Sequence, residues 1–83
     1  MTVQELYLAV SPLAEQVLQI PKFDETTHMV STPAWDSLRH LQLLSAVERK
    51  FGIEIDADEA FRLTSAGRLI QYLHSKLQSE VGE

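Results

Sequence analysis

The stretch WDSLRHLQLLSAVERKFGIEI, residues 35–55, decides the fold of this chain. A helix can begin within it at Asp36 or Ser37, because a short oxygen-bearing side chain satisfies backbone N–H groups that the first turn leaves unpaired. The apolar residues that follow recur at helical spacing and share one face: Leu43, Leu44, Val47 and Phe51. Gly52 ends this pattern, since glycine accepts the left-handed conformation that often closes a helix. We therefore predict a helix over residues 37–51 with an outward-facing serine at its start.

The residues before this stretch indicate one long helix and one long loop. Thr2 and Glu5 have the spacing of a capping box, which places the start of the first helix near Thr2. Apolar residues then recur on one helical face: Val3, Leu6, Val10, Leu13 and Val17. We expect a kink at Pro12 or a restart at Ser11, and the unbroken apolar phase favours a kinked helix. Residues 22–35 show no period and form a long loop, a kind of segment that is often functional. Its expected core anchors are Phe23, Met29 and Val30.

The residues after this stretch add a short helix and a long one. Ile53 and Ile55 alternate with a polar residue, and we expect both to insert into the core rather than to form a strand. A short helix is predicted over residues 58–63. The last helix opens at Thr64 or Ser65, and the residues it should bury share one face: Ala66, Leu69, Ile70, Leu73 and Leu77. The two terminal residues are expected to fray.

Composition limits both the fold and the function. The chain has 83 residues, which makes one domain, residues 1–83: an all-α bundle of three main helices and one short helix. Its net charge of −5 argues against nucleic acid as a partner. No apolar run approaches the ~20 residues of a membrane span, and no secretory signal is visible. We expect a cytoplasmic monomer. The absence of cysteine means that any thiol chemistry must come from a cofactor.

Four residues near the middle of the chain and the segments after them together resemble the acyl carrier protein family. The tetrad is Trp35 to Leu38, and residues 51–55 (FGIEI), 58–60 (DEA) and 64–73 match the later parts of the family pattern. The resemblance implies a carrier-type helical bundle in which Ser37 holds a covalent 4′-phosphopantetheine arm. It implies a discrete, non-catalytic carrier of acyl thioesters for fatty-acid, polyketide or other specialised biosynthesis. The alternatives are a peptidyl or aminoacyl carrier of a nonribosomal-type pathway, or a carrier-like adaptor without the arm.

The resemblance also assigns roles around Ser37. Asp36 helps to present the serine to a phosphopantetheinyl transferase and its metal ion, and a plain capping role is equally compatible with its position. Leu38 lies beside the arm and meets partner enzymes, together with Leu41 and Arg39. Trp35 stands where fatty-acid carriers most often have glycine or a small residue. We expect it to anchor the loop by packing and place it beside the partner-binding residues.

The predicted partners are the phosphopantetheinyl transferase, a cargo-loading ligase or acyltransferase, and a ketosynthase or other enzyme that uses the acyl group. The second helix of fatty-acid carriers is usually acidic, whereas residues 36–51 here carry two acids against three basic residues. Docking should therefore depend less on charge attraction and more on apolar contact. The acids gather instead at Glu54, Asp56, Asp58 and Glu59, a second candidate docking patch.

An enzymatic reading is weaker. Ser37 and His40 can share a helical face, but a catalytic triad also needs an acid behind the histidine, an oxyanion hole and a substrate pocket. Asp36 lies on the wrong side for this role, and the chain is small for a pocket. The three histidines show no metal-ligand spacing, and we expect each to be exposed or half-buried: His28, His40 and His74.

Overall fold

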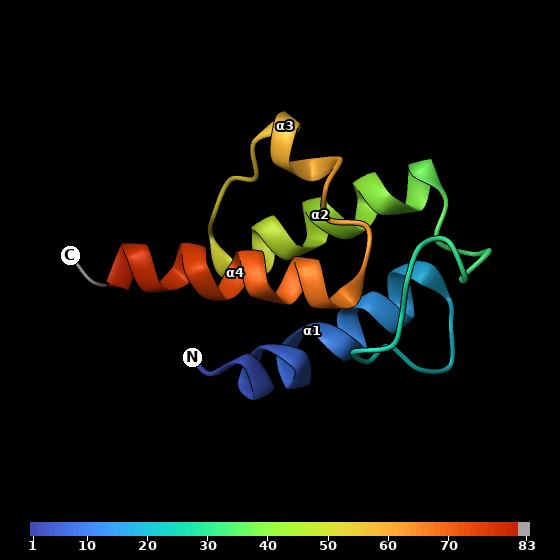
Figure 1. Cartoon of the computed structure of the whole chain (residues 1–83), viewed down its shortest axis with the longest axis horizontal. Helices are drawn as coiled ribbons and strands as arrows, with labels where there is room; N and C mark the ends of the chain where they lie inside the picture. Colours follow the sequence, from blue (N-terminus) through green and yellow to red (C-terminus); the bar gives the residue numbers. More distant parts are fainter. Residues whose placement is uncertain (82–83) are drawn as a thin grey trace.

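The computed structural model describes residues 1–81, which form four helices and no β-strand (Figure 1). The helices are α1 (Val3–Leu18), α2 (Ser37–Phe51), α3 (Ala57–Ala60) and α4 (Ala66–Val81). The predicted all-α architecture is confirmed, and α2 has the predicted bounds. The predicted span of the short helix is wrong: α3 covers one turn, and the chain then continues in turns up to Leu63. The expected fraying of the last two residues lies outside the described residues.

The three long helices enclose the core. α1 packs against both α2 and α4, and α3 lies across the top of the bundle in Figure 1. Each long helix contributes an apolar stripe that is buried at helical spacing: Leu6, Val10, Ala14 and Leu18 from α1, Leu43, Leu44 and Val47 from α2, and Ala66, Leu69, Ile70 and Leu73 from α4. Removing this apolar surface from water is the main favourable contribution to folding.

The start of α1 and the end of α2 are closed by local signals that the sequence shows. At α1, the Glu5 N–H donates to Thr2 Oγ1 (3.1 Å) and the Thr2 N–H donates to Glu5 Oε1 (2.8 Å), as predicted for a capping box. These bonds hold the pKa of Glu5 below its usual value. At the end of α2, Gly52 has φ 66° and donates its N–H to Glu48 O. α1 runs through Pro12 as one helix, so the chain does not restart at Ser11.

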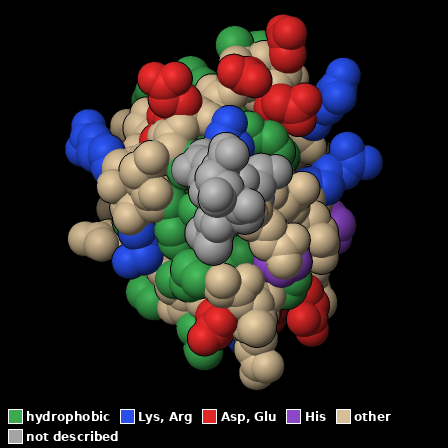
Figure 2. All heavy atoms as spheres, turned by 90° about the vertical axis from the view of Figure 1, so that its left-hand side faces the viewer, with side chains coloured by type: hydrophobic (Ala, Val, Ile, Leu, Met, Phe, Trp, Pro, Cys, Tyr) green, Lys and Arg blue, Asp and Glu red, His purple; other side chains and the backbone are tan. Residues whose placement is uncertain are grey.

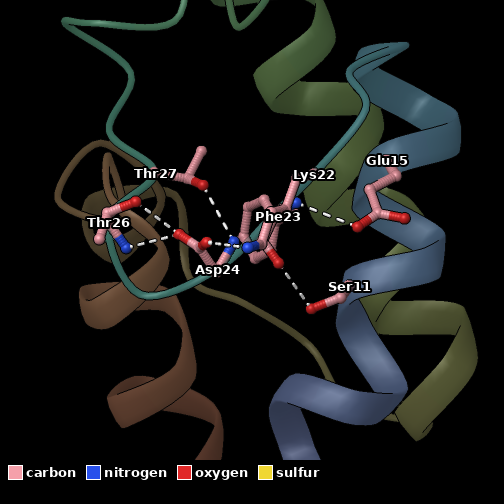
Figure 3. A network of polar contacts seen from close by, with 7 residues as sticks. All are labelled: Ser11, Glu15, Lys22, Phe23, Asp24, Thr26 and Thr27. Carbon is pink, nitrogen blue, oxygen red and sulfur yellow. Dashed lines mark hydrogen bonds and ion pairs between the residues drawn. The ribbon is translucent and has the colours of Figure 1, made fainter.

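The long loop is held against α1 by Phe23 (Figure 3). Its ring is buried, its N–H donates to Glu15 Oε2 (3.0 Å), and its carbonyl accepts from Ser11 Oγ (2.9 Å). Asp24 then closes a turn by accepting from the N–H and the hydroxyl of Thr26, which lowers the pKa of Asp24. These contacts fix the direction in which the chain leaves α1.

The far half of the loop is tied to the start of α4. The Met29 N–H donates to Thr64 O and the Ala66 N–H donates to Thr27 O, each at 2.9 Å. Phe23 and the half-buried Met29 are anchors, as predicted, whereas Val30 is 98% exposed and the prediction for it is wrong. The backbone bonds at Thr27 and Met29, just before Val30, hold the loop without the Val30 side chain.

A few predicted core residues lie at the edge of the core rather than inside it. Phe51, Ile55 and Leu77 are half-buried and pack against the core from one side. Ile53 is buried at 6% exposure, so only one of the two isoleucines is fully inserted. In the described part of the chain, no helix combines the length and the apolar character needed to cross a membrane.

Candidate functional site

Asp36 is the N-cap of α2, and this leaves Ser37 free. The backbone of Asp36 is extended, and its Oδ1 accepts from the Arg39 N–H at 2.9 Å. Ser37 is therefore the first helical residue; it is exposed, and its hydroxyl makes no hydrogen bond to another residue that the structure describes. From the sequence alone, either of these two residues could be the N-cap. The geometry assigns the cap to Asp36 and an accessible hydroxyl to Ser37.

The backbone around Ser37 suits an anion. The N–H groups of Ser37 and Leu38 have no acceptor within residues 1–81, because the first turn of a helix has no preceding carbonyls to bond. α2 has 15 residues, so the positive end of a full helix dipole lies here. A phosphate ester on the Ser37 oxygen would lie beside these donors.

A buried hydrogen-bonded chain lies beneath this surface. The Trp35 indole is 2% exposed, and its Nε1–H donates to His40 Nδ1 at 3.0 Å. The other ring nitrogen of His40, Nε2, lies 2.8 Å from the Ala60 carbonyl oxygen. Trp35 also packs against Phe23 of the loop, with ring centroids 6.0 Å apart. The His40 side chain thus connects α2 to Trp35, at the end of the loop, and to Ala60 of α3. We call this arrangement the His40 bridge (Trp35, His40 and Ala60).

The bridge corrects two predictions. Trp35 lies in the core, so it supports the surface from beneath and does not itself form part of it; its expected packing role is confirmed. His40 is 5% exposed rather than surface or half-buried. His28 is exposed and His74 is half-buried, as predicted. The one sequence signal for the bridge is Trp35 itself, because a buried indole N–H needs an acceptor.

The bridge also determines the tautomer of His40. An indole N–H can only donate, so Nδ1 must be the acceptor and Nε2 must carry the proton given to Ala60. Neither ring nitrogen retains a lone pair for the Ser37 hydroxyl. His40 in this arrangement therefore cannot act as the base of a serine nucleophile.

The phosphopantetheine attachment site family model matches residues 9–73 of the chain. The chain belongs to this family. It is a phosphopantetheine-carrying carrier domain, and such a domain is the site for covalent 4′-phosphopantetheine attachment. Carrier domains of this family are non-catalytic carriers that work with phosphopantetheinyl transferases and with enzymes that use the acyl group. The matched residues include all of α2 and α3, and the fit of the group is supported by the exposed hydroxyl and free N–H groups at Ser37.

The surface of the carrier domain next to Ser37 is apolar. Leu38 is 66% exposed and Leu41 is 56% exposed. Phe61, just after α3, is 78% exposed, and the helix predicted over residues 58–63 gave no indication of its exposure. Arg39 differs from the two leucines: its Nη1 donates to Leu18 O at 3.0 Å, which ties α2 to the end of α1.

Two hollows adjoin this surface. A small groove of about 170 Å³ lies beside Ser37, and its six lining residues are Met29, Ser37, His40, Leu41, Phe61 and Thr64. A wider, open depression of about 390 Å³ follows the exposed side of α2, and it is lined by Leu41, Gln42, Ser45, Ala46 and Arg49. Leu41 lines both, so the groove and the depression adjoin at this side chain.

Acidic side chains gather elsewhere on the carrier domain. Figure 2 shows them along the upper edge, at the height of α3 in Figure 1. Asp58 and Glu59 lie in the first turn of α3, and Arg62 is 3.8 Å from Glu59. In the described part of the chain, no three His, Asp or Glu residues lie close enough together to hold a metal ion.

Proposed function

We propose that Ser37 is the residue that carries the 4′-phosphopantetheine group and that this carrier holds acyl or aminoacyl cargo for a biosynthetic enzyme. One observation carries the proposal: Ser37 is the exposed first residue of α2, and its hydroxyl is spared from capping because Asp36 performs that role. The family match supports it, since residues 9–73 include this position.

In the attachment step the Ser37 oxygen is the nucleophile. It forms a bond to the phosphorus of coenzyme A that bears the pantetheine, its proton passes to a base of the transferase, and adenosine bisphosphate leaves with the electrons of the broken P–O bond. Asp36 Oδ1 is held by the Arg39 N–H, and the second oxygen is free to face the metal ion of the transferase. When bound, the group supplies the thiol that this cysteine-free chain lacks, and that thiol holds cargo as a thioester.

The chain's part in partner recognition is apolar docking. Leu38 and Leu41 follow the attachment residue as exposed side chains of α2, and Leu41 also lines the open depression along the helix. Apolar side chains at the centre of an interface set its lifetime, whereas charges at its rim tune the association rate. The proposed partners are the transferase, a ligase or acyltransferase that loads the cargo, and a ketosynthase or other enzyme that consumes it.

Intact mass after co-expression with a phosphopantetheinyl transferase tests the proposal. The wild-type protein should gain one phosphopantetheine group and Ser37→Ala should gain none, with both proteins equally helical by circular dichroism. Ser75→Ala is the matched control, because Ser75 is an exposed helical serine on α4 that lines neither of the hollows beside Ser37; it should be modified like the wild type. Modification of Ser37→Ala at the wild-type level would refute the assignment.

A further inference from the structure

The groove beside Ser37 has an unusual floor. Of the six residues that line it, only His40 is buried; the others are exposed or half-buried. A buried polar side chain therefore lies on the inner side of a hollow that the apolar side chains of Met29, Leu41 and Phe61 also line. Both hydrogen-bond partners of His40, Trp35 and Ala60, belong to the buried core.

His40 spans the space between α2 and α3 at this point. Its Nε2 is 2.8 Å from the carbonyl oxygen of Ala60, the last residue of α3, and its Nδ1 accepts from the Trp35 indole. Among the described residues that are not exposed, no fully buried side-chain nitrogen or oxygen lacks a hydrogen-bond partner. Any group that enters between α2 and α3 must break this bridge and leave buried polar groups unpaired.

We propose that His40 decides where the cargo lies: the His40 bridge closes the core, so that cargo stays in the shallow groove at the surface, and the carrier is suited to short cargo rather than long acyl chains. This inference rests on the proposed function, because it places the cargo on an arm at Ser37. The groove, at about 170 Å³, is small beside the pockets of about 300–1,000 Å³ that bury typical ligands.

Energetics favour this assignment for short cargo. Each methylene that leaves water contributes a modest, roughly constant favourable free energy. A buried donor or acceptor that loses its hydrogen-bond partner costs more free energy than the burial of one methylene contributes. Opening the bridge would affect three buried groups at once: the indole N–H, the imidazole ring and the Ala60 carbonyl. A cargo of a few carbons cannot offset that loss, and even a chain of about twelve carbons gains little more than it loses, so the cargo remains in the groove.

Loading with pantetheine analogues of two chain lengths tests the inference. A transferase attaches coenzyme A analogues that end in a stable butanoyl or dodecanoyl amide, and intact mass first verifies that both are on the protein. Absence of any mass gain would contradict the proposed function itself. Methyl NMR spectra then compare the core leucines Leu43 and Leu69 with the groove residues Met29 and Leu41. With both analogues, only the groove resonances should move, and His40 should keep its Nε2-protonated neutral tautomer in nitrogen-15 spectra.

Two variants of His40 show whether the bridge is the cause. His40→Val removes both hydrogen bonds, so the dodecanoyl group should now shift the core leucine resonances and raise the melting temperature above that of the unloaded variant. His40→Gln keeps an acceptor and a donor on one side chain and should behave like the wild type. Core shifts in the dodecanoyl-loaded wild type would overturn the inference, as would a folded His40→Val protein whose core resonances stay unchanged. If His40→Val does not fold, Trp35→Phe takes its place, because it removes the donor to His40 Nδ1 and should likewise let the dodecanoyl group shift the core leucine resonances.

Discussion

At the C-terminal end of α2, Val47 is fully buried and Lys50 is exposed; at the N-terminal end, Leu41 is exposed and His40 is buried. The C-terminal end follows the usual rule for an amphipathic helix, with apolar residues inside and charged residues outside. The N-terminal end reverses that rule within one turn of Ser37. Both ends belong to one continuous helix, so the reversal is local.

The buried histidine and the exposed leucine at the N-terminal end of α2 have different roles: His40 supports the fold, and Leu41 is available to a partner or a cargo. A buried polar residue is tolerated when its hydrogen bonds are satisfied, and His40 meets that condition through Trp35 and Ala60. Exposed apolar residues that gather at one place mark a contact surface more often than they serve stability. The same helix thus supplies core at one end and a binding surface at the other.

The largest expected effect is a difference in stability between two leucines on α2. Leu43 is 0% exposed and Leu41 is 56% exposed. Leu43→Ala should lower the free energy of unfolding by about 2–5 kcal/mol, because it leaves a cavity in the core. Leu41→Ala should change it by less than about 0.5 kcal/mol. Urea unfolding of the two variants measures both values, and equal losses would mean that α2 is rotated relative to the present structure.

The sequence was a good guide wherever a local signal set the structure. The bounds of α2 were predictable because Asp36 and Gly52 close its two ends, and the capping box at Thr2 placed α1. The burial of His40 was not predictable, because its partners lie five and twenty positions away and only the folded chain brings Ala60 to it. Val30 was misplaced for a similar reason: backbone bonds between the loop and Thr64 hold the loop in place of its side chain.

The candidate site shows the same division. Ser37 was recognisable from the residues 35–38 at the predicted start of α2, which are a local feature, although the sequence did not decide whether Asp36 or Ser37 is the cap. Tertiary packing brings Phe61 to the groove and Arg39 to the carbonyl of Leu18. Neither contact has a signature in the sequence. The sequence indicated only a partner-facing role for Arg39, whereas its guanidinium also holds α1.

The second prediction concerns the support beneath the site. Trp35→Phe keeps an aromatic ring in the core but removes the donor to His40 Nδ1. Leaving that buried nitrogen without a partner should cost about 1–3 kcal/mol of the free energy of unfolding. Thermal or urea unfolding measures the loss. In a double-mutant cycle with His40→Leu, the losses of unfolding free energy from the two substitutions should be non-additive, because both remove the same hydrogen bond. Strictly additive losses would contradict that bond.

The third prediction separates two roles of Asp36. Asp36→Ala should cost about 1 kcal/mol, because it removes the acceptor for the Arg39 N–H. Asp36→Asn keeps a side-chain oxygen and should remain close to the wild type in stability. If the carboxylate also faces the metal ion of the transferase, both variants should nevertheless be modified more slowly than the wild type in an intact-mass time course. Wild-type modification of Asp36→Asn would restrict Asp36 to capping.

The smallest expected effect belongs to the charges at the C-terminal end of α2. Arg49 borders the depression that begins at Leu41, so it lies at the rim of the proposed docking surface. Arg49→Ala should change the free energy of docking to a cargo-loading partner by less than about 0.5 kcal/mol, because exposed charge pairs are weak and are screened within about 8 Å at physiological salt. Leu41→Ala should cost at least about 1 kcal/mol of docking free energy if it is a central apolar contact.

Arg39→Ala is a poor probe of charge, since it also breaks the bond to Leu18. Loading rates of the Arg49 and Leu41 variants at low and high salt decide between the two kinds of docking. If Arg49→Ala or added salt abolishes loading while Leu41→Ala leaves it intact, then docking is electrostatic and the partner presents an acidic surface to the basic end of α2.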